Sequence, residues 1–154
     1  MKSSIAILSM TIALGCISEA AEASDVMPAE LVGIWATDES TFRGDALISG
    51  TAVYIAADGR AEEVAGPPPI GVKFEMAFDA NTNTLTIARL FNPTAHGWQS
   101  VPSNPGSTLT FDPRKLSLSS DGKPAILHRR VSGLTPAVLK IAGLDCPPLE
   151  CPIP

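Results

Sequence analysis

Between residues 31 and 131 the sequence is a series of short β-prone runs separated by turn residues. The run 72–78 alternates apolar and polar side chains, and the run 84–90 returns after a polar turn. One face of the first run carries only apolar residues, namely Val72, Phe74, Met76 and Phe78. Such alternation is typical of an antiparallel sheet with one buried face and one solvated face.

Seven or eight strands are expected in this region. The expected strands are residues 32–36, 51–56, 61–64, 72–78, 84–90, 107–111, 115–119 and 124–131. Asp58-Gly59 lies between two of them and predicts a hairpin, because a tight primed turn requires positive φ values. The sequence therefore predicts an all-β antiparallel meander, and the strand spacing leaves a barrel and a sandwich both open. Residues 66–69 and 92–106 are expected to be loops.

The C-terminal region, residues 134–154, changes to a helical pattern. Thr135 is placed to cap a helix that begins at Pro136, and Gly143 is placed to end it. Leu134 and Leu139 have the spacing of a hydrophobic staple. We therefore predict a short helix at the end of the sheet domain.

Two cysteines, Cys146 and Cys151, follow this helix, and Cys16 lies near the N-terminus. A pair in an exported chain is most simply a disulfide, which for so short a loop stabilises by about 2 kcal/mol. A zinc site would need two further ligands, and the histidines, His96 and His128, are distant in sequence. We expect a structural disulfide, no metal site and no cofactor.

Residues 1–23 are predicted to be a signal peptide. Lys2 precedes an apolar run from residue 5 to residue 17, and Ala21-Glu22-Ala23 predicts cleavage before Ser24. The run is shorter than the roughly 20 residues that cross a membrane. This indicates a periplasmic or secreted protein in which residues 24–30 form a short linker and residues 31–133 form the β domain.

A second processing route stays open. Ala13-Leu14-Gly15-Cys16 resembles a bacterial lipobox, in which the cysteine is acylated and becomes the first mature residue. The protein would then be an envelope lipoprotein anchored through Cys16. Contact with a membrane is expected only in that case.

The charge of the chain argues against nucleic acid as a partner. Without Lys2, Glu19 and Glu22 of the predicted signal peptide, the 11 basic and 16 acidic residues become 10 and 14, and the net charge of −5 becomes −4. Binding to nucleic acid depends on clustered Lys and Arg side chains facing phosphates. Arg129-Arg130 is a basic pair and not a patch.

The first strand, with Gly33-Ile34-Trp35, and an arginine in the last strand resemble the lipocalin-like proteins. The hairpins at residues 78–87 and 116–122 also look like those of small bacterial members. Over residues 31–133 this resemblance implies a β-barrel, with Gly33 and Trp35 at its closed end. It also implies a structural pair between Trp35 and Arg129 or Arg130, with the arginine packed on the ring.

The candidate functional residues are few. The sequence has no Gly-x-Ser-x-Gly, His-Glu-x-x-His or phosphate-binding loop. His96 and Trp98 lie in the long loop, where a tryptophan can anchor a ligand or partner. Trp98 could instead plug a barrel end or pack on the core. The carboxylates near Arg43, namely Asp38, Glu39 and Asp45, are expected to form a solvated loop.

We expect a non-enzymatic, exported binding protein whose barrel holds a small apolar or amphipathic ligand. Inward-facing Phe74, Met76 and Ile87 would line the site. The alternative is an envelope protein-binding module, such as an enzyme inhibitor or immunity protein, that binds through His96 and Trp98. An enzyme that uses His96 with a nearby carboxylate is a third hypothesis.

Overall fold

The computed structural model describes residues 26–68, 70–102, 107–120 and 126–151. The predicted signal peptide and Cys16 lie outside these residues. The strands are β1 (Gly33–Ala36), β2 (Thr41–Arg43), β3 (Ala46–Ile55), β4 (Arg60–Gly66), β5 (Ile70–Asp79), β6 (Thr84–Thr94), β7 (Gly97–Val101), β8 (Thr108–Asp112), β9 (Ser117–Ser120) and β10 (Ile126–Ser132), and they are followed by α1 (Pro136–Ile141).

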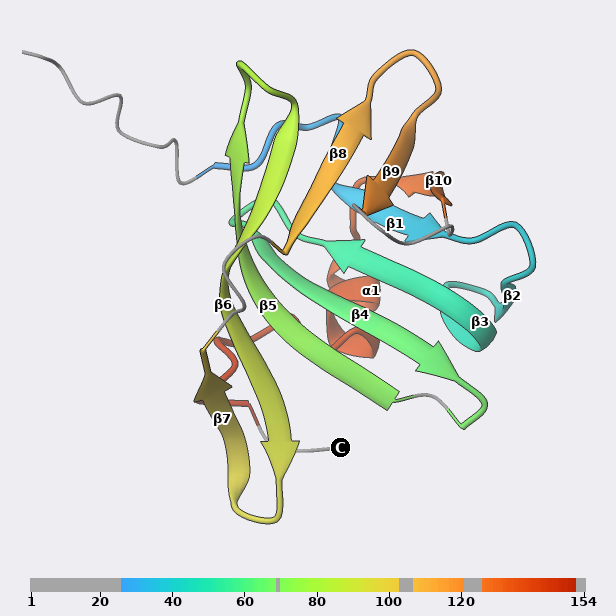
Figure 1. Ribbon diagram of the computed structural model, residues 1–154. Coiled ribbons are helices and arrows are strands. Elements are labelled where there is room, and N and C mark those ends of the chain that lie inside the picture. The colour runs from blue at the N-terminus through green and yellow to red at the C-terminus, as the bar shows by residue number, and fades with distance from the viewer. Residues whose placement is uncertain (1–25, 69, 103–106, 121–125, 152–154) are drawn as a thin grey trace, which may run out of the picture.

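The sheet closes into an eight-stranded antiparallel barrel (Figure 1). β1 pairs with β10 on one side and with β3 on the other, so the first and last strands of the meander meet. Around the barrel the order is β1, β3, β4, β5, β6, β8, β9 and β10. The all-β barrel is confirmed, and of the two architectures that strand spacing left open the sandwich is excluded.

The interior of the barrel is filled by large apolar side chains. Trp35 is fully buried, and its Nε1–H donates to Leu31 O at 2.9 Å. Its ring packs edge to face with that of Phe111, with the ring centroids 5.8 Å apart. The other buried members of this core are Met27, Leu31, Val53, Ile55, Ala61, Phe74, Met76, Leu85, Leu118 and Leu127. Met27 precedes the predicted start of the domain, so part of the expected linker belongs to the core.

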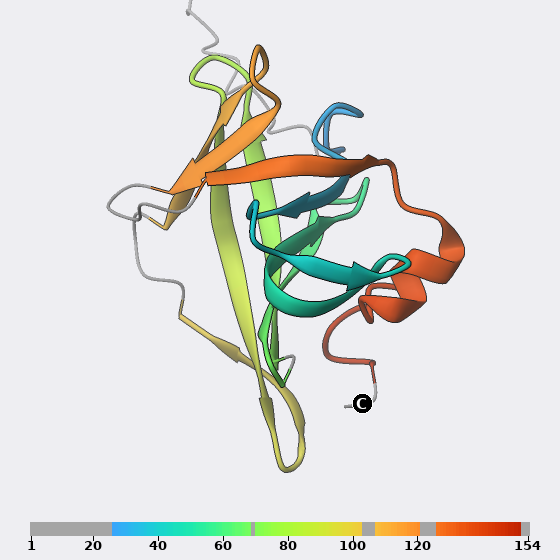
Figure 2. The same cartoon turned by 90° about the vertical axis from the view of Figure 1, so that its right-hand side faces the viewer.

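A second apolar cluster lies on the outside of the barrel wall, where α1 packs (Figure 2). Thr135 Oγ1 accepts a hydrogen bond from Val138 N, and Gly143 ends the helix at a φ of 62°. Leu144 N then donates to Leu139 O, as in a Schellman motif. The predicted cap and stop are both confirmed. The helix is held by Val138, Ala142 and Leu144 against Ile34, Ala52 and Tyr54.

The predicted loop at residues 92–106 is wrong in its first half. β6 continues to Thr94 and forms a hairpin with β7 that extends beyond the barrel (Figure 1). Thr94 Oγ1 donates to Gly97 O at 2.7 Å and closes the turn. Pro93 is tolerated because it lies in the extension of β6 that pairs only with the edge strand β7. Composition alone suggested a loop here, because proline and glycine flank a run of polar residues.

The expected contact between Trp35 and an arginine also differs from the structure. Arg129 is the ladder neighbour of Trp35, but its Nη1 donates to Glu30 O at 3.1 Å. Arg130 lies over the ring of Phe42 at 4.0 Å. Trp35 and Arg129 therefore act together by holding the segment Glu30-Leu31 across the barrel end, and not by cation–π contact.

Candidate functional site

The candidate site is a cavity of about 270 Å³ on the outside of the barrel, hereafter the outer cavity. It lies between the outer face of β4 and β5, the β7 hairpin, and the chain that follows α1. The residues that give it its chemistry are Glu62, Lys73, Trp98, Ile141, Asp145 and the Cys146–Cys151 disulfide.

Strand register places two charged side chains of the outer cavity, the half-buried Glu62 and the buried Lys73, next to each other. Tyr54 on β3 is opposite Glu62 on β4, which is opposite Lys73 on β5, which is opposite Phe91 on β6. Facing residues of adjacent strands project from the same side of a sheet. This row therefore points away from the barrel core and toward the C-terminal chain.

Lys73 is almost fully enclosed, with 2% of its surface exposed. Its Nζ donates to Gly143 O and lies 4.5 Å from the centre of the Trp98 ring. Burial lowers the pKa of Lys73, while Glu62 and Asp145 act in the opposite direction. The ammonium thus ties the C-terminal chain to the barrel wall and occupies one face of the indole.

Glu62 is the second charged residue of the outer cavity and is half-buried. Burial raises the pKa of this carboxyl to about 7, against the opposing effect of Lys73. Its Oε1 lies over Gly71, where a Cβ would collide with it. The glycine on β5 therefore leaves the space that the carboxyl occupies, and near neutral pH the outer cavity contains a carboxyl that is only partly ionised.

Because of Glu62, we expect the free energy of unfolding to fall by about 2 kcal/mol as the pH rises from 5 to 8. The folded protein keeps the proton up to about pH 7, whereas the unfolded chain releases it near pH 4.5. The free energy of unfolding is therefore highest below pH 4.5, where Glu62 is protonated in both states. It falls as the pH rises above 4.5 and reaches its lower value once the pH has passed through 7. Because Glu62 is only half-buried, solvent screens the carboxyl, and the expected loss is smaller than the full pKa shift implies.

Urea unfolding at pH 5, 6, 7 and 8 measures this effect. The Glu62→Gln variant should show a flatter pH profile than the wild type and should be the more stable protein at pH 8. Glu39→Gln changes an exposed carboxylate that does not line the outer cavity and should keep the wild-type slope. Equal slopes in all three proteins would contradict the assignment to Glu62.

Trp98 forms the wall of the outer cavity next to Lys73. Its Nε1–H is buried and has no hydrogen-bond partner among the residues that the structure describes. A buried donor without a partner destabilises by about 1–3 kcal/mol. The indole that sequence reasoning singled out is therefore a cavity wall on the outside of the barrel, and not a plug for its end.

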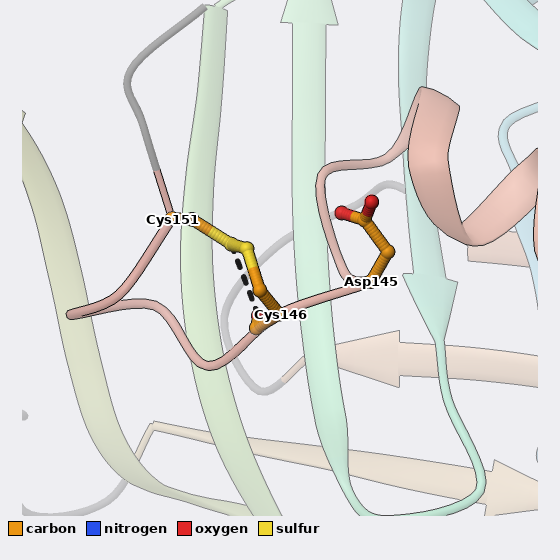
Figure 3. Close-up of side chains that lie close together, drawn as sticks. All are labelled: Asp145, Cys146 and Cys151. Atoms are coloured by element: carbon orange, nitrogen blue, oxygen red, sulfur yellow. Dashed lines mark hydrogen bonds between the residues drawn. A yellow bond between two sulfur atoms is a disulfide. The ribbon is translucent and has the colours of Figure 1, made fainter.

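The predicted disulfide between Cys146 and Cys151 is confirmed, with the two Cα atoms 5.6 Å apart (Figure 3). Asp145 precedes it, and its carboxylate and the two sulfurs lie within 4.8 Å of one another. Metal binding requires the thiolate form of cysteine, which a disulfide does not provide. In this state the group shapes the cavity wall and is not a metal centre.

A second cavity of about 520 Å³ lies on the other side of Trp98. Its lining includes His96, Leu149, Glu150 and Cys151. His96 is exposed at the hairpin turn, where its backbone N donates to Thr94 Oγ1 at 3.2 Å. The structure thus brings His96 and Trp98 next to the disulfide, although some fifty residues separate the hairpin from the cysteines in the sequence.

The other predicted site residues lie elsewhere. Phe74 and Met76 are buried in the barrel core, and Ile87 packs against it. None of these three lines the outer cavity or the second cavity.

Sequence reasoning missed Glu62 and Lys73. The available signal was their place on the outward face of adjacent strands, but nothing nearby in sequence indicates that this face is covered.

Comparison with protein-family models, curated proteins and solved structures finds no match to this chain. Among the residues that the structure describes, no helix has the length and apolar character needed to cross a bilayer. The function must therefore be inferred from the site itself.

Proposed function

We propose that this chain is an exported, lipocalin-like binding protein for a small amphipathic ligand, and that the outer cavity holds the ligand. The observation that carries the proposal is a cavity with an indole wall, one buried charged side chain and one half-buried charged side chain, outside a barrel whose interior holds a packed apolar core. Sites for small molecules typically combine an apolar lining with a few convergent polar groups. At about 270 Å³ the outer cavity suits a ligand smaller than a typical drug.

The filled interior is the reason for moving the ligand from the barrel core to its outer wall. An eight-stranded barrel is just wide enough either to be filled by side chains or to enclose one small ligand. Here Trp35, Phe111 and Leu118 belong to the packed core, with at most 4% of their surface exposed. A ligand in the same space would have to displace them.

Export is supported by the cysteine pair. A disulfide is compatible with an oxidising compartment such as the periplasm or the exterior of the cell. The N-terminal sequence of the purified protein tests this part of the proposal directly. A start at Ser24 would indicate soluble export, whereas an acylated Cys16 would indicate an anchored lipoprotein.

Native mass spectrometry of the protein purified from its own cell envelope tests the binding function. We expect a retained small-molecule mass that is lost in Trp98→Ala and kept in Met76→Leu, a core change that conserves volume. Thermal unfolding of both variants controls for loss of the fold. Loss of the adduct in Met76→Leu but not in Trp98→Ala would place the ligand in the barrel and refute the outer cavity.

A second candidate function is a protein-binding module. Ile141 and Leu149 beside Trp98 are 54% and 64% exposed, and exposed apolar side chains around an aromatic residue are typical of partner surfaces. A stoichiometric protein adduct in the same spectra, lost on Leu149→Glu, would favour this function over the small ligand.

A further inference from the structure

The outer cavity has hydrogen-bond donors that the fold leaves unused. Trp98 Nε1–H has no partner among the described residues, and the hydrogen bond of Lys73 Nζ goes to Gly143 O, which uses one of three ammonium protons. Lys140 at the rim adds a further ammonium group. A ligand that brings acceptor oxygens would satisfy these donors, whereas a purely apolar ligand would leave them unpaired.

The charges around the cavity also select among ligands. Lys73 and Lys140 are cationic, Asp145 is anionic, and Glu62 is partly protonated near neutral pH. When Glu62 holds its proton, the lining carries one net positive charge. Lys73 already occupies a face of the Trp98 ring at 4.5 Å, so a cationic ligand cannot use that face for cation–π contact.

We propose that the outer cavity selects small amphipathic carboxylates, whose headgroup accepts hydrogen bonds from Trp98 Nε1–H and Lys73 and whose apolar part lies along Ile141, Ala142 and the disulfide. This inference deepens the binding function proposed above and rests on it. The donors fix the headgroup, and the apolar wall between α1 and the tail accommodates the body of the ligand.

Access to both donors requires an outward turn of the Trp98 ring, because Nε1 is closed off from solvent and Lys73, which lies against the ring, has 2% of its surface exposed. The position of Trp98 permits this movement. β7 pairs only with β6 and lies outside the closed barrel, so its side chains can move without breaking the barrel ladder. The barrel core, including Trp35, is expected to stay unchanged.

Binding of a carboxylate to this cavity should depend on the ionisation of Glu62. The charged and titratable groups around Glu62 are Tyr54 on β3, Arg60 on β4, Lys73 on β5, Lys140 on α1 and Asp145 in the tail. The protonated carboxyl does not repel an anionic headgroup, whereas the ionised one does. Affinity should therefore rise as the pH falls through 7 and decline again when the ligand itself protonates, below about pH 5.

The experiment is a titration of ¹⁵N-labelled protein with three probes of equal chain length: octanoate, 1-octanol and octylammonium. The indole Nε1–H signals of Trp35 and Trp98 are followed by NMR and assigned with Trp98→Phe. Trp35, which already donates to Leu31 O, is the internal control. We expect octanoate to shift the Trp98 signal downfield and leave that of Trp35 in place.

In the same titrations we expect octanoate at pH 6 to bind at least about tenfold more tightly than either other probe, since a hydrogen bond to a charged group contributes about 1.5 kcal/mol or more. Affinity for octanoate should be about tenfold weaker at pH 8 than at pH 6, following the ionisation of Glu62, and nearly independent of pH in Glu62→Gln. Trp98→Phe, which keeps a ring and removes the donor, should weaken octanoate about tenfold and 1-octanol little.

The outcomes separate this inference from the function on which it rests. If 1-octanol or octylammonium shifts the Trp98 signal and binds as tightly as octanoate, the cavity binds amphipathic ligands but the carboxylate preference is wrong. If octanoate binds while the Trp98 signal stays in place, the proposed headgroup contact is wrong. If no probe binds, the carboxylate class is overturned, and a retained ligand in the native mass spectrum then decides whether the binding function survives.

Discussion

Replacement of Trp35 by alanine should lower the free energy of unfolding by about 3–5 kcal/mol, the range for removing a large aromatic side chain from a packed core. The side chain is fully buried in the barrel core, and its ring packs edge to face with that of Phe111. The same substitution also removes the hydrogen bond from Nε1 to Leu31 O, which closes the barrel end. Urea unfolding followed by far-ultraviolet circular dichroism measures the loss.

Two further variants control this prediction. Trp35→Phe retains most of the apolar volume and should cause a smaller loss than Trp35→Ala. Ile126→Ala changes a side chain on β10 that is 49% exposed, and its effect should stay within about 0.5 kcal/mol. A loss below about 1 kcal/mol for Trp35→Ala would mean that the barrel does not depend on a packed centre.

Replacement of Gly33 by alanine should lower the free energy of unfolding by about 3 kcal/mol. Gly33 has a φ of 153°, and a Cβ there would collide with the carbonyl oxygen of Val131 on the neighbouring strand. That oxygen belongs to backbone and cannot move without opening the pairing of β1 with β10, which closes the barrel. The glycine of the Gly-x-Trp sequence is therefore required by the close approach of two strands.

Gly44→Ala is the matched control for this substitution. Gly44 also has a positive φ, of 59°, but a Cβ there would meet nothing within 4 Å. The control variant should show only the backbone strain of a left-handed residue, about 1 kcal/mol. Equal losses at the two positions, measured by the same urea unfolding, would show that the φ value and not the collision explains the requirement for glycine.

The outer cavity depends on parts of the chain that are far apart. Lys73 on β5 donates to Gly143 O, a separation of 70 residues, and Trp98 arrives from a hairpin that extends beyond the barrel. The tail that carries Gly143 is held by α1 on one side and by the disulfide on the other. Any ligand in the cavity therefore contacts the barrel wall and the C-terminal tail at the same time.

Much of the fold follows from local patterns in the sequence. Alternation in residues 72–78, the hairpin at Asp58-Gly59 and the Thr135-Pro136 helix start depend on neighbouring residues alone, and each is found in the structure. The hairpin turn differs in detail from the predicted primed turn, because of its two residues Gly59 has a positive φ and Asp58 does not. The hairpin at residues 84–101 was harder to predict. Pro93 and Gly97 are turn formers in most contexts, and only pairing of β6 with β7 makes them part of strands.

Closure of the barrel and the chemistry of the cavity were decided by the tertiary structure. The sequence by itself determined an antiparallel meander with a helix and a cysteine pair at its end, because those features are set by residues close together in the chain. Closure required β1 to pair with both β3 and β10. From the sequence alone, Glu62 and Lys73 look like solvated residues on the outer faces of two adjacent strands. They acquire shifted pKa values only because a distant tail covers them, and an alternating strand pattern cannot show what lies over its polar face.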